Sequence, residues 1–190
     1  MLKLSAAELA RVHEVTRSVR DRTSARFEVV IVPVSDRYAL YPIAFGALAA
    51  LAAAGLLALA RTSLGAQGLF AIEAVVFVLV SVVLEWLPAK LLLVPRRQKE
   101  ERARQFAHRA FAATILAARE REVGMVLFAS LGERYVELVT DDALDRRVGQ
   151  AVWNGIVADF TAAARAGRLA DGLSGAIEAC GRQLAQHFPK

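Results

Sequence analysis

Two long apolar runs in the middle of the chain constrain its fold more than any other feature. The first, residues 41–60, reads YPIAFGALAALAAAGLLALA and contains no charged side chain. The second, residues 69–87, reads LFAIEAVVFVLVSVVLEWL and includes Glu73 and Glu85. A helix rises about 1.5 Å per residue, so each run is long enough to cross the roughly 30 Å hydrocarbon core of a bilayer. We therefore predict two membrane-spanning helices, with a kink at Pro88 if the second helix continues beyond its span.

The charges around these runs predict the orientation of the pair. The connecting segment RTSLGAQG, residues 61–68, is short enough to force an antiparallel hairpin whose ends lie on one side of the membrane. Its only basic residue is Arg61, whereas the outer flanks carry Arg37, Lys90, Arg96, Arg97, Lys99, Arg102 and Arg104. Because basic flanks stay in the cytoplasm, we predict a two-span protein of the cytoplasmic (inner) membrane with both termini in the cytoplasm. Tyr41 and Trp86 are the expected interfacial anchors.

The rest of the sequence predicts helices and strands on both sides of the hairpin. Ser5 and Glu8 form a capping box that opens a helix ending near Thr23. The inner face of this helix is formed by Leu9, Val12, Thr16 and Val19. Residues 27–34, FEVVIVPV, indicate a buried strand. After the hairpin, an amphipathic helix over residues 96–119 is followed by an antiparallel pair of strands over residues 124–130 and 135–140. Two helices close the chain, one ending near Gly167 and one running to Phe188.

The order of these elements predicts the architecture. A strand, a crossover helix and a second strand imply a parallel pair, so we expect an α/β fold with three layers, α/β/α, and a mixed sheet. Residues 1–37 and 96–190 would form this domain, and residues 38–95 would form the transmembrane helical hairpin. Both ends of the hairpin then return to one sheet, so we expect the domain to lie close to the membrane.

Composition argues against nucleic-acid binding, an internal disulfide and a zinc site. The net charge of +5 and the isoelectric point of about 9.9 are compatible with nucleic-acid binding. The basic residues, however, gather at the membrane boundaries and have no aromatic residues between them for base stacking, so we expect no nucleic-acid partner. The chain has one cysteine, Cys180, which cannot form an internal disulfide and falls in the apolar stripe of the last helix. The three histidines are scattered, so a zinc site is not expected.

Several stretches, taken in order, resemble the TPM domain, a family that includes thylakoid-lumen repair proteins and bacterial membrane-anchored proteins. These stretches are LSAAELARVHEVTRSVRDRTSARFEVVIVPV at the start, FAHRAFAAT at residues 106–114, GMVLFASLGERYVELVT at residues 124–140, and residues 160–177 with Arg165, Ala166, Gly167 and Gly172. The resemblance covers nearly all of the chain outside residues 38–94. It implies one of three activities described for the family: phosphatase-like, calcium-binding, or helping to repair membrane complexes.

An acidic loop after the last strand is the best candidate for a metal site. Many members of the family carry a Gly-rich segment there, whereas this chain continues directly into Asp141, Asp142 and Asp145. Carboxylates in a loop suit Ca²⁺ or Mg²⁺, and Glu133, Glu137 or Asp36 would add oxygens if the fold brings them close. The simpler alternative, which we favour, is that Asp142 or Asp145 caps the next helix.

We expect a membrane-tethered module that binds a membrane-protein complex or helps to assemble or maintain it. Its expected partners are the lipid bilayer and either a membrane protein or further copies of the chain. Two alternatives stay open. The resemblance and the acidic loop allow a divalent-metal-dependent phosphatase, and carboxylates within the second span, Glu73 and Glu85, allow an oligomeric transport component.

Overall fold

The computed structural model describes residues 4–60, 65–116 and 123–190, and divides the chain into two compact units. One unit is made of Met1–Ser35 and Glu100–Lys190, and we call it the sheet unit. The other is Asp36–Lys99, which we call the hairpin unit. Residues 61–64 of the predicted connecting segment and residues 117–119 of the predicted amphipathic helix lie outside the described residues.

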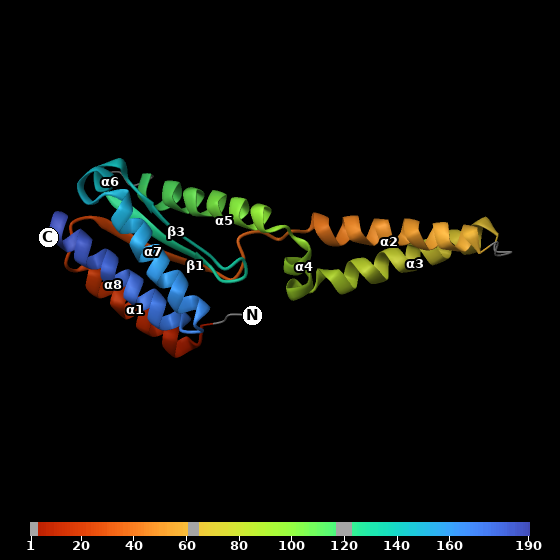
Figure 1. The fold of residues 1–190 in the computed structure, drawn as a ribbon, viewed down its shortest axis with the longest axis horizontal. Helices are drawn as coiled ribbons and strands as arrows, with labels where there is room; N and C mark the ends of the chain where they lie inside the picture. Colours follow the sequence, from red (N-terminus) through yellow and green to blue (C-terminus); the bar gives the residue numbers. More distant parts are fainter. Residues whose placement is uncertain (1–3, 61–64, 117–122) are drawn as a thin grey trace. The chain divides into compact units, whose positions relative to one another are not determined.

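The sheet unit contains the mixed sheet that the sequence predicts (Figure 1). Its strands are β1 (Arg26–Val32), β2 (Gly124–Ser130) and β3 (Tyr135–Thr140), in the spatial order β1-β2-β3. β1 pairs parallel with β2, and β2 pairs antiparallel with β3, as expected. β1 ends at Val32, two residues before the predicted end, because Pro33 has no N–H to continue the ladder.

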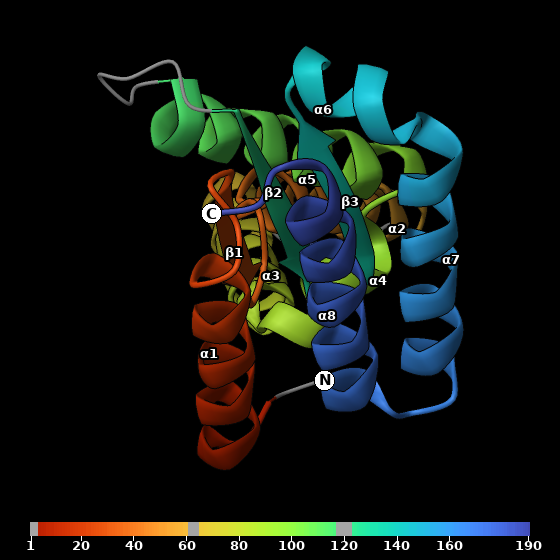
Figure 2. The same cartoon turned by 90° about the vertical axis from the view of Figure 1, so that its left-hand side faces the viewer.

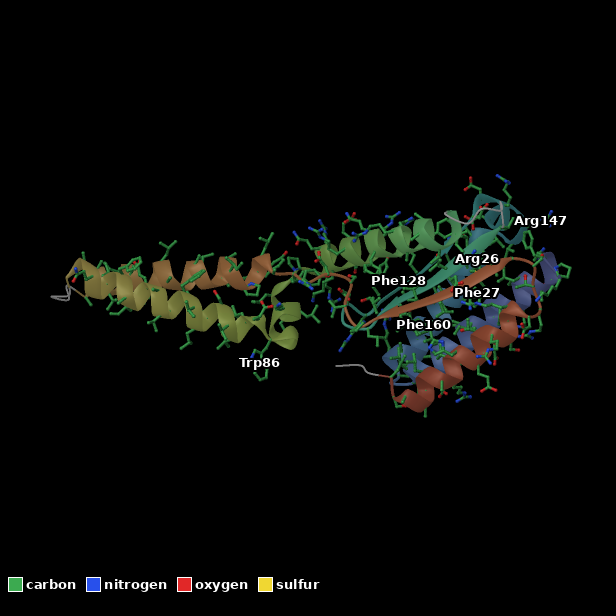
Figure 3. All side chains as sticks on the ribbon, turned by 180° about the vertical axis from the view of Figure 1, so that it is seen from behind. Arg26, Phe27, Trp86, Phe128, Arg147 and Phe160 are labelled. Carbon is green, nitrogen blue, oxygen red and sulfur yellow. The ribbon has the colours of Figure 1, made fainter. Side chains whose placement is uncertain are left out.

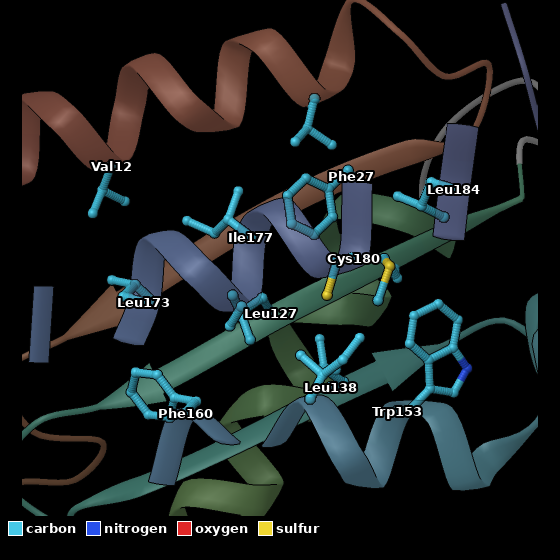
Figure 4. Close-up of a cluster of buried hydrophobic side chains, with 14 of the residues drawn as sticks. Val12, Phe27, Leu127, Leu138, Trp153, Phe160, Leu173, Ile177, Cys180 and Leu184 are labelled. Atoms are coloured by element: carbon cyan, nitrogen blue, oxygen red, sulfur yellow. The ribbon is translucent and has the colours of Figure 1, made fainter. Parts of the chain in front are cut away.

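Three long helices cover one face of this sheet: α1 (Ala6–Arg20), α7 (Gln150–Arg165) and α8 (Leu169–His187), as Figure 2 shows. Phe27, Leu127 and Leu138 of the strands pack there against Trp153 and Ile177 of the helices (Figure 4). The capping box at the start of α1 is present, with the Glu8 backbone N–H donating to Ser5 Oγ at 3.2 Å. Leu9 is exposed, so its predicted place on the inner face is wrong, and α1 ends at Arg20 rather than near Thr23.

The opposite face of the sheet is covered by α5 (Arg96–Phe111) and a π-helical turn, η1 (Ala112–Leu116). Ala103, Ala107 and Phe111 of α5 pack on Val126 and Phe128 of the central strand. The sheet therefore lies between two helical layers, which confirms the predicted α/β/α arrangement.

A short helix, α6 (Asp142–Val148), separates β3 from α7. The sequence predicted two closing helices and did not separate this one. α6 has only one buried apolar residue, Leu144, so its sequence shows no helical repeat of apolar residues. It ends at Gly149, whose φ of +89° belongs to the left-handed side of the backbone map that glycine adopts easily.

The described part of the hairpin unit contains the helices α2 (Leu40–Leu59), α3 (Ala66–Glu85) and α4 (Leu87–Leu93), and the first residues of α5. α2 and α3 pack side by side (Figure 1), and Gly46 of α2 allows close contact with Ser81 of α3. Both helices are long and apolar enough to cross a membrane, with mean hydropathies of 2.1 and 2.3. The second helix breaks at Trp86, and Pro88 lies in the first turn of α4, where a missing N–H is tolerated.

Candidate functional site

The acidic loop that the sequence singled out forms the start of α6. Asp141 is the N-cap residue, and its Oδ1 accepts a hydrogen bond from the backbone N–H of Ala143 at 2.8 Å. Asp145 Oδ1 accepts a hydrogen bond from Thr140 Oγ1 at 2.5 Å, and Asp142 is exposed in the first turn. The cap is therefore Asp141, rather than Asp142 or Asp145 as the capping alternative supposed.

Asp141 and Asp145 each already accept a hydrogen bond from the chain. A Ca²⁺ ion needs about six to eight oxygen ligands, and within residues 4–60, 65–116 and 123–190 no three His, Cys, Asp or Glu side chains are grouped to hold a metal. The Ca²⁺ or Mg²⁺ site at Asp141, Asp142 and Asp145 stays a prediction for experiment.

Glu133 lies in the turn before β3, so the whole strand separates it from Asp141, roughly 20 Å at strand rise. Its carboxylate accepts hydrogen bonds from the backbone N–H of Ser35 at 2.8 Å and from Ser35 Oγ at 2.7 Å. It also accepts one from Ser130 Oγ. Both serines are buried. Glu133 thus fastens the segment after β1 to the β2–β3 turn, which is a structural role.

Another carboxylate, Glu137, is the centre of a group of polar side chains between α5 and β3. Tyr135 Oη donates to Glu137 Oε2 at 2.9 Å, and Glu137 Oε1 lies 3.6 Å from His108 Nε2 and 3.9 Å from Arg104 Nε. We call these four residues the α5–β3 polar cluster. The Glu137 side chain is 22% exposed, whereas Arg104 and His108 are largely exposed. Burial is the main cause that raises the pKa of Tyr135, and the hydrogen bond to Glu137 is the second.

The α5–β3 polar cluster is the strongest candidate site because it brings four residue types to one accessible place. An open hollow beside it is lined by Glu101, Arg104, Gln105, His108 and Arg109 of α5. The cluster offers a carboxylate, a guanidinium, an imidazole and a phenol, which can donate and accept hydrogen bonds to a polar or charged partner. Arg109 lies over the Phe106 ring at 5.8 Å, which keeps a second guanidinium on this surface.

Sequence reasoning missed this cluster, although its signal was present. Tyr135 and Glu137 are two residues apart and therefore lie on the same face of a strand. Arg104 and His108 are four residues apart and lie on one side of a helix. Recognising the cluster from sequence required knowing that α5 packs across β3 on that face. Glu137 was considered only as an additional metal ligand.

Cys180 lies in the core, as its place in the apolar stripe predicted. Its side chain is fully buried, and burial raises the pKa of the thiol to about 12. A reactive cysteine needs an accessible thiolate. Cys180 is therefore a packing residue rather than a nucleophile.

The hairpin unit holds an ion pair between Glu85 at the end of α3 and Lys90 in α4. The Lys90 side chain is only 7% exposed, whereas that of Glu85 is 59% exposed. Lys90 Nζ also donates to the carbonyl oxygen of Arg37 at 3.5 Å. The pair joins α4 to the end of α3 and to the segment that enters α2.

A comparison with protein families identifies the domain to which part of the chain belongs. A family model described as the TPM domain matches residues 89–183, which are half of the chain. The matched range contains α5, β2, β3, α6 and α7, together with parts of α4 and α8. The first helix and first strand, which also carried the resemblance, precede this range. No curated protein and no solved structure matches the chain.

Proposed function

Because the chain belongs to the TPM domain family, we propose that it is a membrane-tethered cytoplasmic module of this family, which binds a membrane-protein complex or helps to assemble or maintain it. The proposal places the hairpin in the cytoplasmic membrane and the sheet unit in the cytoplasm. Its partners are the bilayer and a membrane protein.

The observation that carries the proposal is the position of the hairpin in the chain. α2 and α3 are long and apolar enough to cross a membrane, and they are inserted between β1 and α5. β1 pairs with β2, which follows α5, so the chain must leave one sheet and return to it. A two-span hairpin satisfies this requirement because both of its ends lie on one side of the bilayer. The bias of basic residues towards the outer flanks supports the cytoplasm as that side.

The α5–β3 polar cluster supports binding as the task of the sheet unit. Arg104 and His108 are exposed, and both lie beside a carboxylate that is mostly covered. Such a surface suits a polar partner, because charged side chains at an interface determine which partner is selected and how fast it associates. The apolar side chains exposed on α2 and α3 suit contact with lipid or with another span.

The test is affinity capture from native membranes with a tag after Lys190. Wild-type protein is compared with a variant that combines Arg104→Ala and His108→Ala. The matched control combines Arg182→Ala and His13→Ala, which removes the same two residue types from exposed positions of the same unit. We expect a defined set of membrane proteins with the wild type and the control, and a reduced set with the cluster variant.

Equal recovery of that set with all three proteins would remove the cluster from the proposal. If the wild type is cross-linked in the native membrane before capture and still recovers no membrane protein, the proposal as a whole is contradicted. Its cytoplasmic placement has a separate test, because a fluorescent reporter fused after Lys190 must report the cytoplasm, and an external signal would contradict the orientation.

A further inference from the structure

The hairpin unit ends in a segment that combines exposed apolar side chains with exposed cations. Trp86, the N-cap residue of α4, is 73% exposed, and Leu92, near the end of α4, is 86% exposed. Figure 3 shows the Trp86 side chain pointing away from the ribbon. Arg96 and Arg97 follow within a few residues and are exposed, and Lys99 is half-buried.

Two contacts hold these residues at one end of the hairpin. The Tyr41 phenol, in the first turn of α2, donates a hydrogen bond to Gln98 Oε1, so the first turn of α5 lies beside the start of α2. The ion pair between Lys90 and Glu85 holds α4 at the end of α3. The exposed apolar residues Trp86 and Leu92 and the exposed cations therefore lie at the end of the hairpin where α2 begins and α3 ends.

The cations of this segment differ in whether a carboxylate pairs with them. Lys90 is buried and paired with Glu85. In the described part of the chain, by contrast, no carboxylate forms an ion pair with Arg96, Arg97 or Lys99. These three positive charges are available to a negatively charged surface outside the protein.

We infer that the segment of Trp86, Leu92, Arg96, Arg97 and Lys99 docks on anionic phospholipid headgroups of the leaflet that faces this end of the hairpin. The inference rests on the proposed insertion of α2 and α3, and it adds the class of lipid that the protein selects. Tryptophan is enriched at the level of the headgroups, and Leu92 supplies apolar surface for the acyl boundary. Each lysine or arginine near an anionic leaflet adds attraction that salt weakens.

The experiment measures which lipid contacts Trp86. Full-length protein is reconstituted in vesicles of phosphatidylcholine and phosphatidylglycerol, in which either one lipid or the other carries brominated acyl chains that quench tryptophan fluorescence. Trp153 is buried in the core and supplies a background, which a Trp86→Phe variant measures. The ratio of quenching by the two brominated lipids, at equal mole fractions, gives the preference for the anionic lipid around Trp86.

For the wild type we expect quenching by both lipids and a preference for phosphatidylglycerol of about three-fold or more, reduced by 0.5 M salt. A variant with Arg96→Gln, Arg97→Gln and Lys99→Gln should approach a ratio of one. The matched control, with Arg146→Gln, Arg182→Gln and Lys190→Gln, loses the same charge from exposed positions in the sheet unit and should keep the wild-type ratio.

Quenching by both lipids with a ratio of one in the wild type would overturn the inference and leave the proposed membrane insertion intact. The same preference in the Arg96, Arg97 and Lys99 variant would also overturn it, since the selectivity would then come from elsewhere. A Trp86 signal that neither brominated lipid quenches would contradict the inference together with the insertion on which it rests.

Discussion

Lys90 is buried against the carboxylate of Glu85, and this pair closes the corner between α3 and α4. Removing the carboxylate leaves a buried ammonium without its partner. We predict that Glu85→Gln destabilises the hairpin unit by roughly 1–3 kcal/mol, less than a fully buried pair because Glu85 itself is exposed. The measurement is unfolding in mixed micelles, with Glu73→Gln as the control in the same helix. Adding Lys90→Met to Glu85→Gln should restore most of the loss, and a double variant as unstable as the single one would contradict this account.

Gly181 of α8 lies against Val19 of α1 so closely that an added Cβ would be 2.5 Å from Val19 Cγ2. We predict that Gly181→Ala lowers the free energy of unfolding by about 1–3 kcal/mol, because the two helices must separate. Gly175 in the same helix has no atoms within 4 Å of the corresponding position. Gly175→Ala should therefore stabilise the protein by up to about 1 kcal/mol. Thermal unfolding followed by circular dichroism distinguishes the two, and equal shifts would show that the α1–α8 contact is looser than described.

Asp141 and Asp142 have different predicted roles at the start of α6. Asp141→Ala removes the cap and should cost about 1 kcal/mol of stability, whereas exposed Asp142→Ala should cost little. If capping is the main role of the loop, 5 mM Ca²⁺ or Mg²⁺ leaves the midpoint of thermal unfolding unchanged. A rise in the wild-type midpoint that both substitutions abolish would instead establish the metal site. Metal-dependent phosphoester hydrolysis lost in the same variants would then favour the phosphatase alternative.

Cys180 should be unreactive towards thiol reagents in the folded protein. At pH 8 we expect modification of the native protein to be at least about 100-fold slower than in guanidinium, because the thiol is buried and its pKa is raised to about 12. Because the pKa of this thiol is raised in the folded state, the thiol contributes its full stabilisation at pH values below the pKa that it has in the unfolded chain, near 9. That contribution is lost as the pH rises from about 9 towards 12. Rapid modification of the native protein would show that α8 opens readily.

The sequence predicted the elements whose apolar pattern is regular. β2 and β3 have the predicted bounds, and Cys180 is buried as its place in the apolar stripe indicated, together with Leu173, Ile177 and Leu184 at helical spacing in α8. The two apolar runs become two helices of the expected length, with shifts of one to three residues at their ends. Strong periodicity and long hydrophobic runs are local properties, so they can be read without knowing the tertiary structure.

The features that the sequence did not predict are short helices and details that depend on tertiary contacts. α4 and α6 are seven-residue helices, too short to show a period. Leu9 is apolar and falls on the predicted inner face of α1, but only the packed structure shows that no partner covers it. The α5–β3 polar cluster joins residues of a helix and a strand that are far apart in the sequence, and its members lack a motif. The capping residue was predicted as Asp142 or Asp145 and is Asp141, because three neighbouring aspartates offer similar caps.

The parallel pairing of Arg26 with Gly124 has a consequence for how the protein is made. β1 leaves the ribosome before the other two strands, and β2, which lies beside it in the described sheet, is synthesised after both apolar helices and α5. During that interval a strand rich in valine has no partner, and such a strand is prone to associate with other chains. Delivery of the hairpin to the membrane would bring the two ends of the interruption together and shorten the search of β2 for β1. Biogenesis of the sheet is thus expected to wait on insertion, so a failure of insertion should appear first as aggregation of the newly made chain.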